Sequence, residues 1–506
     1  MRGVRWLVVA AAAVFSSLLP PAAGAQSLAQ LLPRLLSESV TMPSSVPTAP
    51  GQVIPGNPHE AHFLPDAAQQ AAPYALNTAV VSQLATFPLG SSSGGFTYTF
   101  DEATGVPSRS SGNFGPAFAE RALTQGKHRF SWGFTFQRVQ YDQFEGLDLQ
   151  NGPITFYLRH NECCLGQSPS GTPAILPPVP TEDEYPSFEG DLVKDQLSLK
   201  ATTETGAFLA TFGLTDRVDV GVVVPIVKVT LDGTMFSTIL RLGSSNNPDI
   251  HSFGPPDPDH KTTSEHGSAT GLGDIALRAK ANLMRRPGGG LALGVDLRLP
   301  TGDEKNLLGT GATQLRPYLI WSQDFGRVSP HLNAGYTASF GQLSAQTTSF
   351  DLGDEAATPT LPTAQDPYTT VSGGSGLTSA DVSRDVPDEI NYTGGLVVSA
   401  HPRLSLSVDV IGRTLRNVPR FGLMTQSFPY RLVTDPAPPA PPARHAEYQA
   451  LDITSAKGNM TLLLGAAGLK WNVASRLLLN VNVLFPLNDQ GLRPGVTPAF
   501  SFDYTF

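Results

Sequence analysis

The chain ends in Val496-Thr497-Pro498-Ala499-Phe500-Ser501-Phe502-Asp503-Tyr504-Thr505-Phe506. Apolar and aromatic residues occupy every second position, and small or polar residues occupy the positions between them. A period of two predicts a strand with one apolar face. Such an edge invites aggregation in a soluble sheet, whereas a transmembrane barrel turns it to lipid. The ending therefore predicts the closing strand of an outer-membrane barrel, with Phe506 as part of the membrane-insertion signal.

The first 25 residues have the pattern of a secretory signal peptide. Arg2 and Arg5 give a basic start, and residues 6–19 form an apolar run broken only by two serines. Ala23-Gly24-Ala25 is a cleavage site of small residues. The apolar run is too short to span a membrane as a helix. We expect cleavage after Ala25 and export of the rest of the chain.

Composition favours a barrel over a globular protein. The 506 residues include 49 Gly and 44 Pro, and only 15% are charged. The mean hydropathy is near neutral, as expected where lipid-facing and lumen-facing residues alternate. The net charge of −9 argues against nucleic acid as a partner.

Two regions follow the signal peptide. Residues 26–93 form a Pro/Ala-rich leader, in which residues 27–40 can make a short helix interrupted by Pro33. We expect this leader to lie in the periplasm or to plug the lumen. Residues 94–506 are the expected outer-membrane β-barrel.

Fourteen segments of the barrel region alternate like strands. They are 96–100, 130–137, 147–159, 191–213, 218–231, 272–284, 289–299, 313–323, 328–340, 390–400, 403–413, 460–471, 476–486 and 496–506. The segment 191–213 is long, and its apolar parity shifts near Thr205-Gly206. The shift predicts a bulge, with a tight turn as the competing interpretation.

The connections alternate between short and long ones, as periplasmic turns and extracellular loops do. Short turns are expected at 214–217, 286–288, 324–327, 400–403 and 473–475, and long loops at 160–190, 232–271, 300–312, 341–389 and 414–459. We predict an all-β, antiparallel transmembrane barrel of 14 strands. The alternative is 12 strands, with the first two segments outside the wall.

The alternation also separates lipid-facing from lumen-facing residues. A charge on the lipid face costs about 2–4 kcal/mol at the midplane, so charged residues of the opposite parity are expected to line the lumen. The lumen-lining candidates are Asp274, Arg278, Lys280, Asp296, Arg298, Arg316, His331, Asp409 and Lys470.

Several turn and strand motifs occur in a characteristic order. They are Gly213-Leu214-Thr215-Asp216-Arg217-Val218-Asp219-Val220-Gly221, Val224-Pro225, Gly271-Leu272-Gly273-Asp274-Ile275, Leu299-Pro300-Thr301-Gly302-Asp303 and Leu307-Leu308-Gly309-Thr310-Gly311. In this order they resemble the outer-membrane family named for the MetA pathway of phenol degradation, over residues 190–340. The resemblance implies an architecture like that of fatty-acid channel proteins, and uptake or efflux of small hydrophobic or aromatic molecules. The motifs themselves specify no chemistry.

Three features could be mistaken for metal sites. Cys163-Cys164 and His160 could supply ligands, but adjacent cysteines are poor joint ligands. A vicinal disulfide or an intermolecular link suits an oxidising compartment better. The histidines of the 232–271 loop suit a solvated Pro-rich loop. The acidic 341–389 loop is either solvated or bridges divalent cations to lipopolysaccharide. We predict no metal site.

The sequence predicts a channel or transporter rather than an enzyme. Ser329 and His331 lie about 7 Å apart on one strand, too far for a nucleophile and its base, and no cofactor motif is present. The expected function is outer-membrane passage of small, hydrophobic or aromatic molecules. The alternative is a structural or surface-interaction barrel without transport. Expected partners are outer-membrane lipid, lipopolysaccharide, the barrel assembly machinery and a small solute.

Overall fold

The computed structural model describes residues 27–42, 45–49, 52–55, 63–64, 83, 95–101, 106–109, 111–152, 154–160, 190–243, 251–351, 376–432, 444–474 and 476–506. The expected signal peptide and the Cys163-Cys164 pair lie outside these residues. Within them, none of the helices combines the length and the apolar character needed to cross a membrane.

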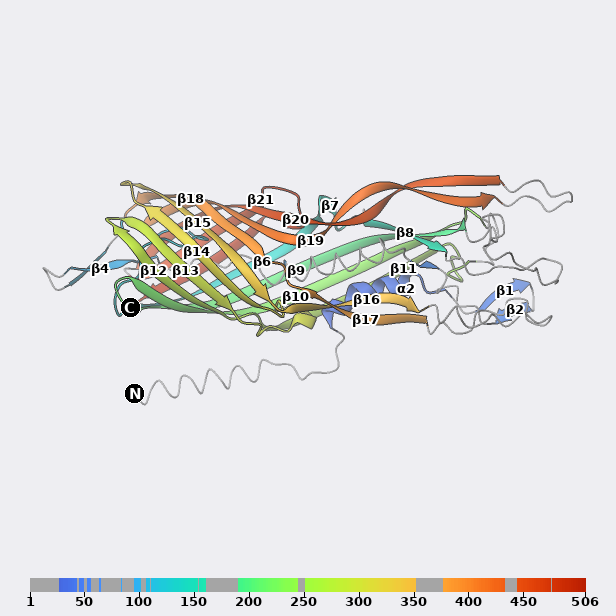
Figure 1. Cartoon of the computed structure of the whole chain (residues 1–506), viewed down its shortest axis with the longest axis horizontal. Coiled ribbons are helices and arrows are strands. Elements are labelled where there is room, and N and C mark those ends of the chain that lie inside the picture. Colours follow the sequence, from blue (N-terminus) through green and yellow to red (C-terminus); the bar gives the residue numbers. More distant parts are fainter. Residues whose placement is uncertain are drawn as a thin grey trace, which may run out of the picture.

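The described strands form a closed antiparallel barrel (Figure 1). β6 (Phe130–Phe144) closes it, because this strand pairs with β9 (Leu192–Gly213) on one side and with β23 (Thr497–Thr505) on the other. Between β9 and β23 the wall consists of β10 (Val218–Leu240), β12 (Ala276–Arg286), β13 (Gly289–Arg298), β14 (Thr313–Gln323), β15 (Val328–Phe340), β18 (Glu389–His401), β19 (Leu404–Leu432), β20 (Arg444–Ala474) and β21 (Leu477–Pro486).

The all-β transmembrane barrel expected from the sequence is confirmed, with the alternative number of 12 strands in place of 14. The two surplus segments were not the first two. Segment 96–100 overlaps β4 (Tyr98–Asp101), which pairs with β5 (Val106–Arg109) in a separate hairpin. Segment 147–159 contains β7 (Leu147–Asp148) and most of β8 (Ile154–His160). Segment 130–137, in contrast, is part of β6 and belongs to the wall.

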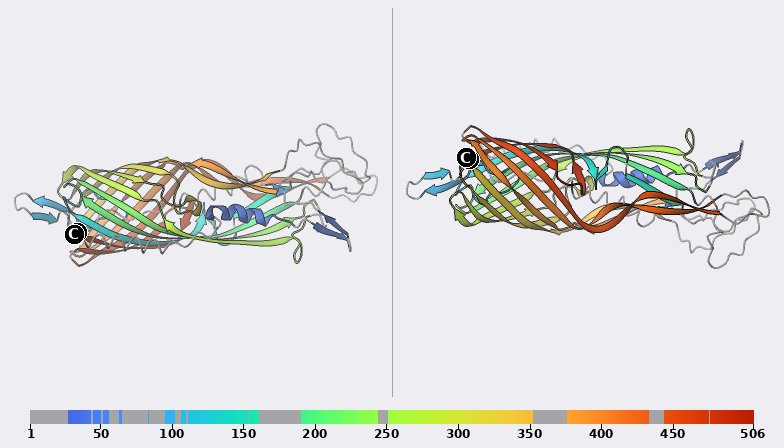
Figure 2. Two further views of the ribbon diagram at one scale, coloured as in Figure 1. Left: turned by 90° about the horizontal axis from the view of Figure 1, so that it is seen from below. Right: turned by 90° about the horizontal axis from the view of Figure 1, so that it is seen from above.

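Several expected loops are β-ribbons that continue past the barrel (Figure 2). β19 and β20 stay paired as far as Leu432 and Arg444, inside the expected 414–459 loop. β10 pairs with β11 (His260–Leu272) inside the expected 232–271 loop, and β16 (Gln342–Asp351) pairs with β17 (Gly376–Asp385) inside the expected 341–389 loop. These segments are polar in sequence but satisfy their backbone groups by pairing.

Four short strands complete the described β-structure. β3 (Phe63–Leu64) pairs with β8, and β22 (Leu492–Pro494) pairs with β6. β1 (Ser45–Ala49) and β2 (Gln52–Pro55) pair only with each other.

The outer surface of the wall changes character at one row of side chains. Arg138 of β6, Glu204 of β9 and Lys228 of β10 are neighbours in register. Arg138 Nε lies 3.6 Å and Lys228 Nζ 3.8 Å from the Glu204 carboxylate. On the side of the short turns, the outward residues of these strands include the exposed Phe130, Trp132, Phe136, Phe208 and Phe212. Beyond the row they include Gln140, Lys200 and Asp232. The row marks the edge of a lipid-facing band, and we call it the boundary row.

The inner surface changes in the opposite sense at the boundary row. Beyond it, the inward residues of the three strands are apolar and buried, among them Val139, Leu197, Leu199, Val229 and Leu231. On the turn side they include Ser131, Gln137, Thr205, Thr211 and Asp219. This inversion explains the shift of apolar parity near Thr205-Gly206. The register of β9 with β6 and β10 is continuous through Gly206, so the expected bulge or tight turn is wrong.

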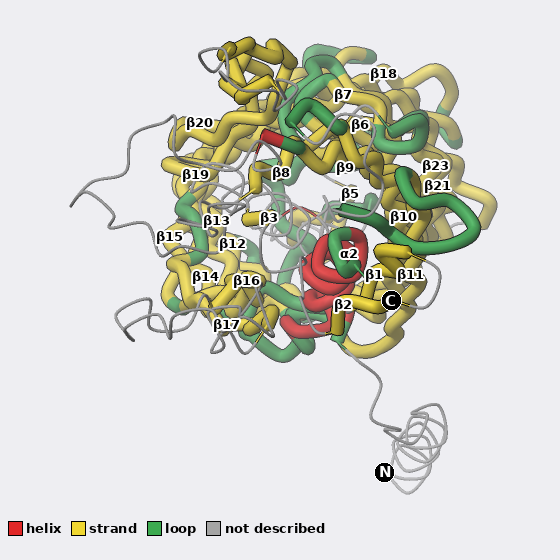
Figure 3. Tube along the Cα trace, turned by 90° about the vertical axis from the view of Figure 1, so that its right-hand side faces the viewer, coloured by secondary structure: helices red, strands yellow, loops and turns green. Residues whose placement is uncertain are grey.

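The apolar interior beyond the boundary row holds the N-terminal helix. η1 (Leu28–Gln30) leads into α2 (Leu31–Ser39), which lies inside the barrel when the molecule is viewed along its axis (Figure 3). The helix expected over residues 27–40 is therefore present, and Pro33 sits in its first turn, where a proline is tolerated. Five leucines pack against the apolar wall: Leu28, Leu31, Leu32, Leu35 and Leu36.

Polar contacts fix both the side and the end of α2. Arg34 forms an ion pair with Glu265 of β11. Lys261 Nζ donates to the carbonyls of Glu38 at 2.6 Å and Thr41 at 2.9 Å. A cation at a helix C-terminus satisfies the last carbonyls and complements the helix dipole. The leader thus contributes a helix that is docked in the lumen beyond the boundary row.

Candidate functional site

Residues 111–127, called the lumen segment from here on, lie inside the barrel near its short turns. Asn113 Nδ2 donates to Asp324 at 2.8 Å and to Ser329 Oγ at 2.6 Å. The Glu120 backbone N–H donates to Asn333 Oδ1 at 2.6 Å, and Asn333 Nδ2 returns a bond of 2.9 Å to the Glu120 carbonyl. The inward side chains of the wall therefore serve as partners for a chain segment that has no strand pairing of its own.

Two lysines of the expected lumen set are bound to the carbonyls of this segment. Lys470 Nζ donates to the carbonyls of Pro116 at 2.6 Å and Phe114 at 3.4 Å. Lys280 Nζ donates to the Leu123 carbonyl at 3.0 Å. These lysines come from β20 and β12, so the lumen segment is held by well-separated strands of the wall.

A buried carboxylate of the lumen segment meets the wall cations. Glu120 lies 3.8 Å from Arg278 Nη1 and 3.7 Å from Lys280 Nζ. Lys280 also lies 3.5 Å from Asp219 of β10. Asp219 in turn accepts from the Gln125 backbone N–H at 3.0 Å. The middle and the C-terminal part of the lumen segment are thus tied to one charge network.

A second centre of charge lies on three neighbouring strands. Asp296 of β13 is 3.5 Å from Arg278 Nε and forms an ion pair with Arg316 of β14. Tyr318 donates its hydroxyl to Asp296 at 3.2 Å. A buried charge is tolerated when it is paired and hydrogen-bonded. These side chains brace each other in the described structure.

The remaining lumen candidates have local partners. His331 Nε2 is hydrogen-bonded to Asp409, and both side chains are buried. Arg298 donates to Gln314 at 3.2 Å. Asp274 accepts from the backbone N–H groups of Gly302 at 3.0 Å and Thr310 at 2.8 Å, which fixes the 299–312 loop.

The lumen segment and the inward side chains of the wall meet inside the barrel at the level of the lipid-facing band. All nine candidates lie on the inner side of the wall, and each has a hydrogen-bonding or charged partner. Asn113 and Glu120 were not predicted from the sequence, because only charged residues of the wall strands were taken as candidates. Asn333 has inward parity on its strand but, being uncharged, was not among those candidates. The one available signal was that residues 111–127 do not alternate although they directly precede a strand.

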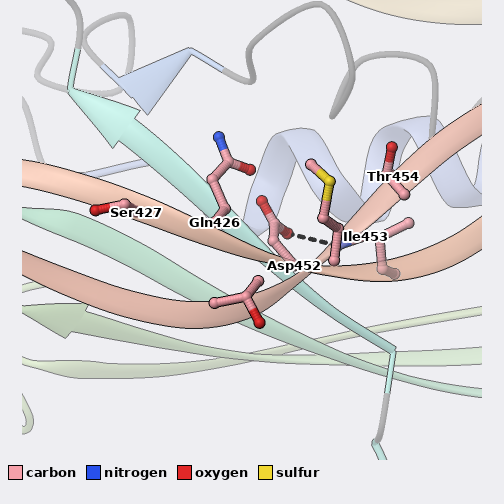
Figure 4. A pocket seen from close by; sticks show the side chains of 7 residues that line it. Gln426, Ser427, Asp452, Ile453 and Thr454 are labelled. Carbon is pink, nitrogen blue, oxygen red and sulfur yellow. Dashed lines mark hydrogen bonds between the residues drawn. The ribbon is translucent and has the colours of Figure 1, made fainter.

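A surface cavity lies away from this network, on the ribbon of β19 and β20 (Figure 4). It has a volume of about 390 Å³ and is lined by Met424, Thr425, Gln426, Ser427, Asp452, Ile453 and Thr454. Asp452 accepts from the Ile453 backbone N–H at 2.8 Å. A neighbouring apolar void is lined by Phe144, Leu147, Ile154, Phe156, Phe421 and Ile453. One small apolar void therefore occurs at the mouth, beyond the boundary row.

The described residues show no group of three or more His, Cys, Asp or Glu side chains placed to hold a metal ion. Of the three histidines in the expected 232–271 loop, His251 is buried and its Nδ1 lies 2.8 Å from Asp191 Oδ2. His260 and His266 each pair with one aspartate, Asp257 and Asp232.

Comparisons with known proteins give one family match and several structural likenesses. Residues 186–357 match the family described as "Putative MetA-pathway of phenol degradation". No curated protein matches the chain by sequence.

Three solved structures are similar in fold. An outer membrane channel from Pseudomonas putida F1 has 10% identity over 76% of this chain and 98% of its own, with a TM-score of 0.37. The monoaromatic hydrocarbon channel CymD has 8% identity over 75% and 89%, with a TM-score of 0.36. The toluene transporter TbuX from Ralstonia pickettii has 9% identity over 76% and 91%, with a TM-score of 0.32.

The matched residues 186–357 include every motif on which the sequence resemblance was based, from Gly213-Leu214 to Gly309-Thr310-Gly311. These motifs form the turn between β9 and β10, the entry to β12 and the loop that Asp274 holds. The resemblance is therefore confirmed over residues 186–357 of the chain, the part that matches this family.

Proposed function

We propose that this protein is a gated outer-membrane channel for small hydrophobic molecules. The inversion of the wall at the boundary row carries this proposal. Contact with lipid requires an apolar exterior of the barrel. It does not require an apolar interior in the part of the wall that extends beyond the membrane. Leu197, Leu199, Val229 and Leu231 nevertheless line the inside of the protruding wall. We call this apolar inner surface beyond the boundary row the funnel. It gives an apolar solute a place to leave water before the solute reaches the membrane.

Two separable pieces of chain occupy the proposed path. α2 covers the apolar funnel, and the lumen segment fills the polar part below it. Passage of a solute then requires α2 and the lumen segment to move away from the path. Both are held by side-chain contacts to the wall rather than by strand pairing, so they can shift without opening the barrel.

The substrate class follows from the lining and from the family. An interior of aliphatic and aromatic side chains favours solutes with little charge. The family match is consistent with aromatic compounds. We propose small hydrophobic or aromatic molecules, with the wall charges acting on any ion that passes the lumen segment.

Planar-bilayer recording of the full-length protein, with aromatic and fatty-acid solutes added, tests this function. The chosen variant places two carboxylates in the funnel, Leu199→Asp with Val229→Asp. Its matched control places them on the outer face of the same strands, Ser198→Asp with Thr230→Asp. The funnel variant should lose the solute-dependent change in current, and the control should keep it. Equal responses in both variants would exclude the funnel as the entry site.

One observation favours the alternative, a structural or surface-interaction barrel. The wall charges are paired with each other and with the lumen segment, as a permanently closed barrel requires. The same recordings separate the two functions. A barrel without transport activity shows no channel events in the wild type, nor in variants that loosen the lumen segment.

The remaining proposals concern processing and assembly. We propose that residues 1–25 are removed as a signal peptide, that residues 26–93 act as a leader whose helix plugs the lumen, and that residues 94–506 contain the barrel. We also propose that the barrel assembly machinery recognises the strand ending in Phe506, and that lipopolysaccharide surrounds the wall near the boundary row.

A further inference from the structure

Every strand that rises from the short-turn end is preceded by a basic residue. Arg129, Arg217, Arg327, Arg403 and Arg476 each stand immediately before β6, β10, β15, β19 and β21. The sixth rising strand, β13, follows Arg286 by three positions. Neither the pairing of the strands nor passage through the lumen requires this repetition.

Backbone hydrogen bonds show that the five arginines occupy equivalent positions in the wall. Each arginine carbonyl accepts one N–H from the neighbouring descending strand, at 2.8 to 3.1 Å. The donors are Gly213, Asn282, Ser399, Asn472 and Thr505, in the order of the arginines above. The five side chains therefore start at a common level around the barrel, and we call this set with Arg286 the arginine rim.

The exception at β13 has a conformational reason. The position equivalent to the five arginines is Gly288, whose carbonyl accepts from the Asp324 N–H at 3.0 Å. Gly288 has a φ of 75° in the tight turn that joins β12 and β13. Only glycine adopts that conformation without strain. The cation is supplied instead by Arg286, the last residue of β12.

Five of the rim arginines, all except Arg129, have no carboxylate partner among the residues that the structure describes. None of these five takes part in an ion pair there. Arg129 donates to the terminal main-chain oxygen of Phe506 at 3.3 Å and stacks on Tyr98, and the other five are exposed. This concentration of unneutralised positive charge contrasts with the net charge of −9 of the whole chain.

The two acidic residues of the turns do not neutralise the rim. Asp216 accepts the Lys127 backbone N–H at 3.1 Å. Asp324 accepts from Ser111 and Asn113 of the lumen segment, at 2.7 and 2.8 Å. Both carboxylates are therefore engaged with the lumen segment, and the guanidinium groups remain available for an external anion.

The rim borders the lipid-facing band directly. Phe130 and Val328 follow two of its arginines in sequence, and Phe325 and Phe506 lie at the same end of the barrel. All four side chains are large, apolar and exposed. A level of exposed aromatic side chains with basic residues next to it is typical of the place where the lipid headgroups begin.

We propose that the arginine rim binds the phosphates of anionic phospholipids in the periplasmic leaflet. The short turns mark this end as periplasmic. Guanidinium groups recognise phosphate oxygens through paired hydrogen bonds. The arginine rim has a member at each of the six rising strands and so surrounds the barrel. Lipids also surround the barrel, whereas a single protein partner would contact only one side of it.

The test compares lipid selectivity of the full-length protein reconstituted in vesicles of phosphatidylcholine. Electron paramagnetic resonance measures the association of spin-labelled phosphatidylglycerol relative to spin-labelled phosphatidylcholine. The rim variant replaces five arginines by glutamine: Arg217, Arg286, Arg327, Arg403 and Arg476. The matched control replaces five exposed basic residues at or beyond the opposite edge of the band by glutamine: Arg138, Lys200, Lys228, Arg416 and Lys457.

The wild type and the control should prefer the anionic lipid by roughly fivefold or more, because each base near an anionic surface attracts it. The rim variant should show a ratio near one. Replacement of the same five arginines by lysine should retain most of the preference and provides a second variant should the glutamine variant fold poorly. Equal lipid ratios in wild type and rim variant would overturn the proposal. So would binding of a periplasmic protein or of peptidoglycan that depends on the rim without any lipid preference.

Discussion

Glu120 of the lumen segment and Lys280 of β12 form a buried ion pair, with 3.7 Å between Oε2 and Nζ. This pair links a segment without strand pairing to the inner face of the wall. Arg278 lies 3.8 Å from the other oxygen of the same carboxylate. The loss of one partner of a buried pair leaves the other charge uncompensated, which costs about 3–5 kcal/mol. The position of the lumen segment therefore depends strongly on this carboxylate.

Glu120→Gln should loosen the lumen segment and raise the single-channel conductance. The variant leaves Arg278 and Lys280 with less neutralising charge, so the open lumen should also prefer anions. Planar-bilayer recordings and reversal potentials measure both effects. Glu447→Gln, an exposed position on the β20 ribbon, is the control. An unchanged conductance and ion preference in Glu120→Gln would show that this carboxylate does not hold the segment.

The boundary row predicts where a charge becomes costly on the outer wall. Phe208 faces lipid and is 45% exposed, whereas Ser198 lies on the same face of β9 beyond Glu204. Phe208→Arg should destabilise the barrel by about 2–4 kcal/mol, because it places a charge in lipid. Ser198→Arg should change stability by less than about 0.5 kcal/mol. Denaturant unfolding in lipid vesicles compares the two, and equal losses would contradict a lipid edge at this row.

The wall strands could be predicted from the sequence because every second residue of a membrane-spanning strand faces lipid and is apolar. Along β15, residues such as Leu332 and His331 alternate without a break, and the structure places them on opposite faces. The rule fails beyond the membrane. There Leu199 is apolar because it faces α2, and its outward neighbour Lys200 faces water. The resulting change of parity looked like a bulge in a sequence with no marker for the membrane edge.

The count of strands and the lumen contacts could not be predicted for related reasons. Alternation cannot separate a wall strand from a ribbon or hairpin, since Tyr98–Asp101 and β8 alternate equally well. Glu120 lies in a segment without periodicity, and its contact with Lys280 depends on how the 159 residues between them fold. The parity of a wall charge was predictable, and the identity of its partner was not.

Phe506 is expected to matter for assembly. Its backbone N–H donates to the Phe130 carbonyl at 2.8 Å, and the two rings lie 5.8 Å apart, so this residue helps to close the barrel. Deletion of Phe506 should lower the membrane-inserted, heat-modifiable fraction of the protein. Phe500→Ala, which removes an exposed aromatic from the middle of the same strand, is the control. An unchanged inserted fraction after the deletion would argue against a role in insertion.

Ser39 at the end of α2 lies between two oxygen atoms. Its Oγ is 2.7 Å from the Leu36 carbonyl and 2.9 Å from Asp195 Oδ2, and both side chains are buried. A hydroxyl has one hydrogen to donate. Both contacts are satisfied when Asp195 is protonated and donates to Ser39. Burial raises the pKa of Asp195 to about 6, against opposing hydrogen bonds from Ser237 and Ser39 and the charge of Lys261.

The docking of α2 should therefore weaken as the pH rises through 6. A carboxyl whose pKa is raised in the folded state contributes stability below its ordinary pKa near 4, and this stability is lost as the pH passes 6. The difference of about two units corresponds to about 3 kcal/mol. Hydrogen exchange of residues 31–39, corrected for the intrinsic rate, should show less protection at pH 7.5 than at pH 5. Asp195→Asn should keep the protection at both pH values, and Asp232→Asn, on the outer face, should behave like the wild type. A pH dependence that survives Asp195→Asn would assign the effect to another group.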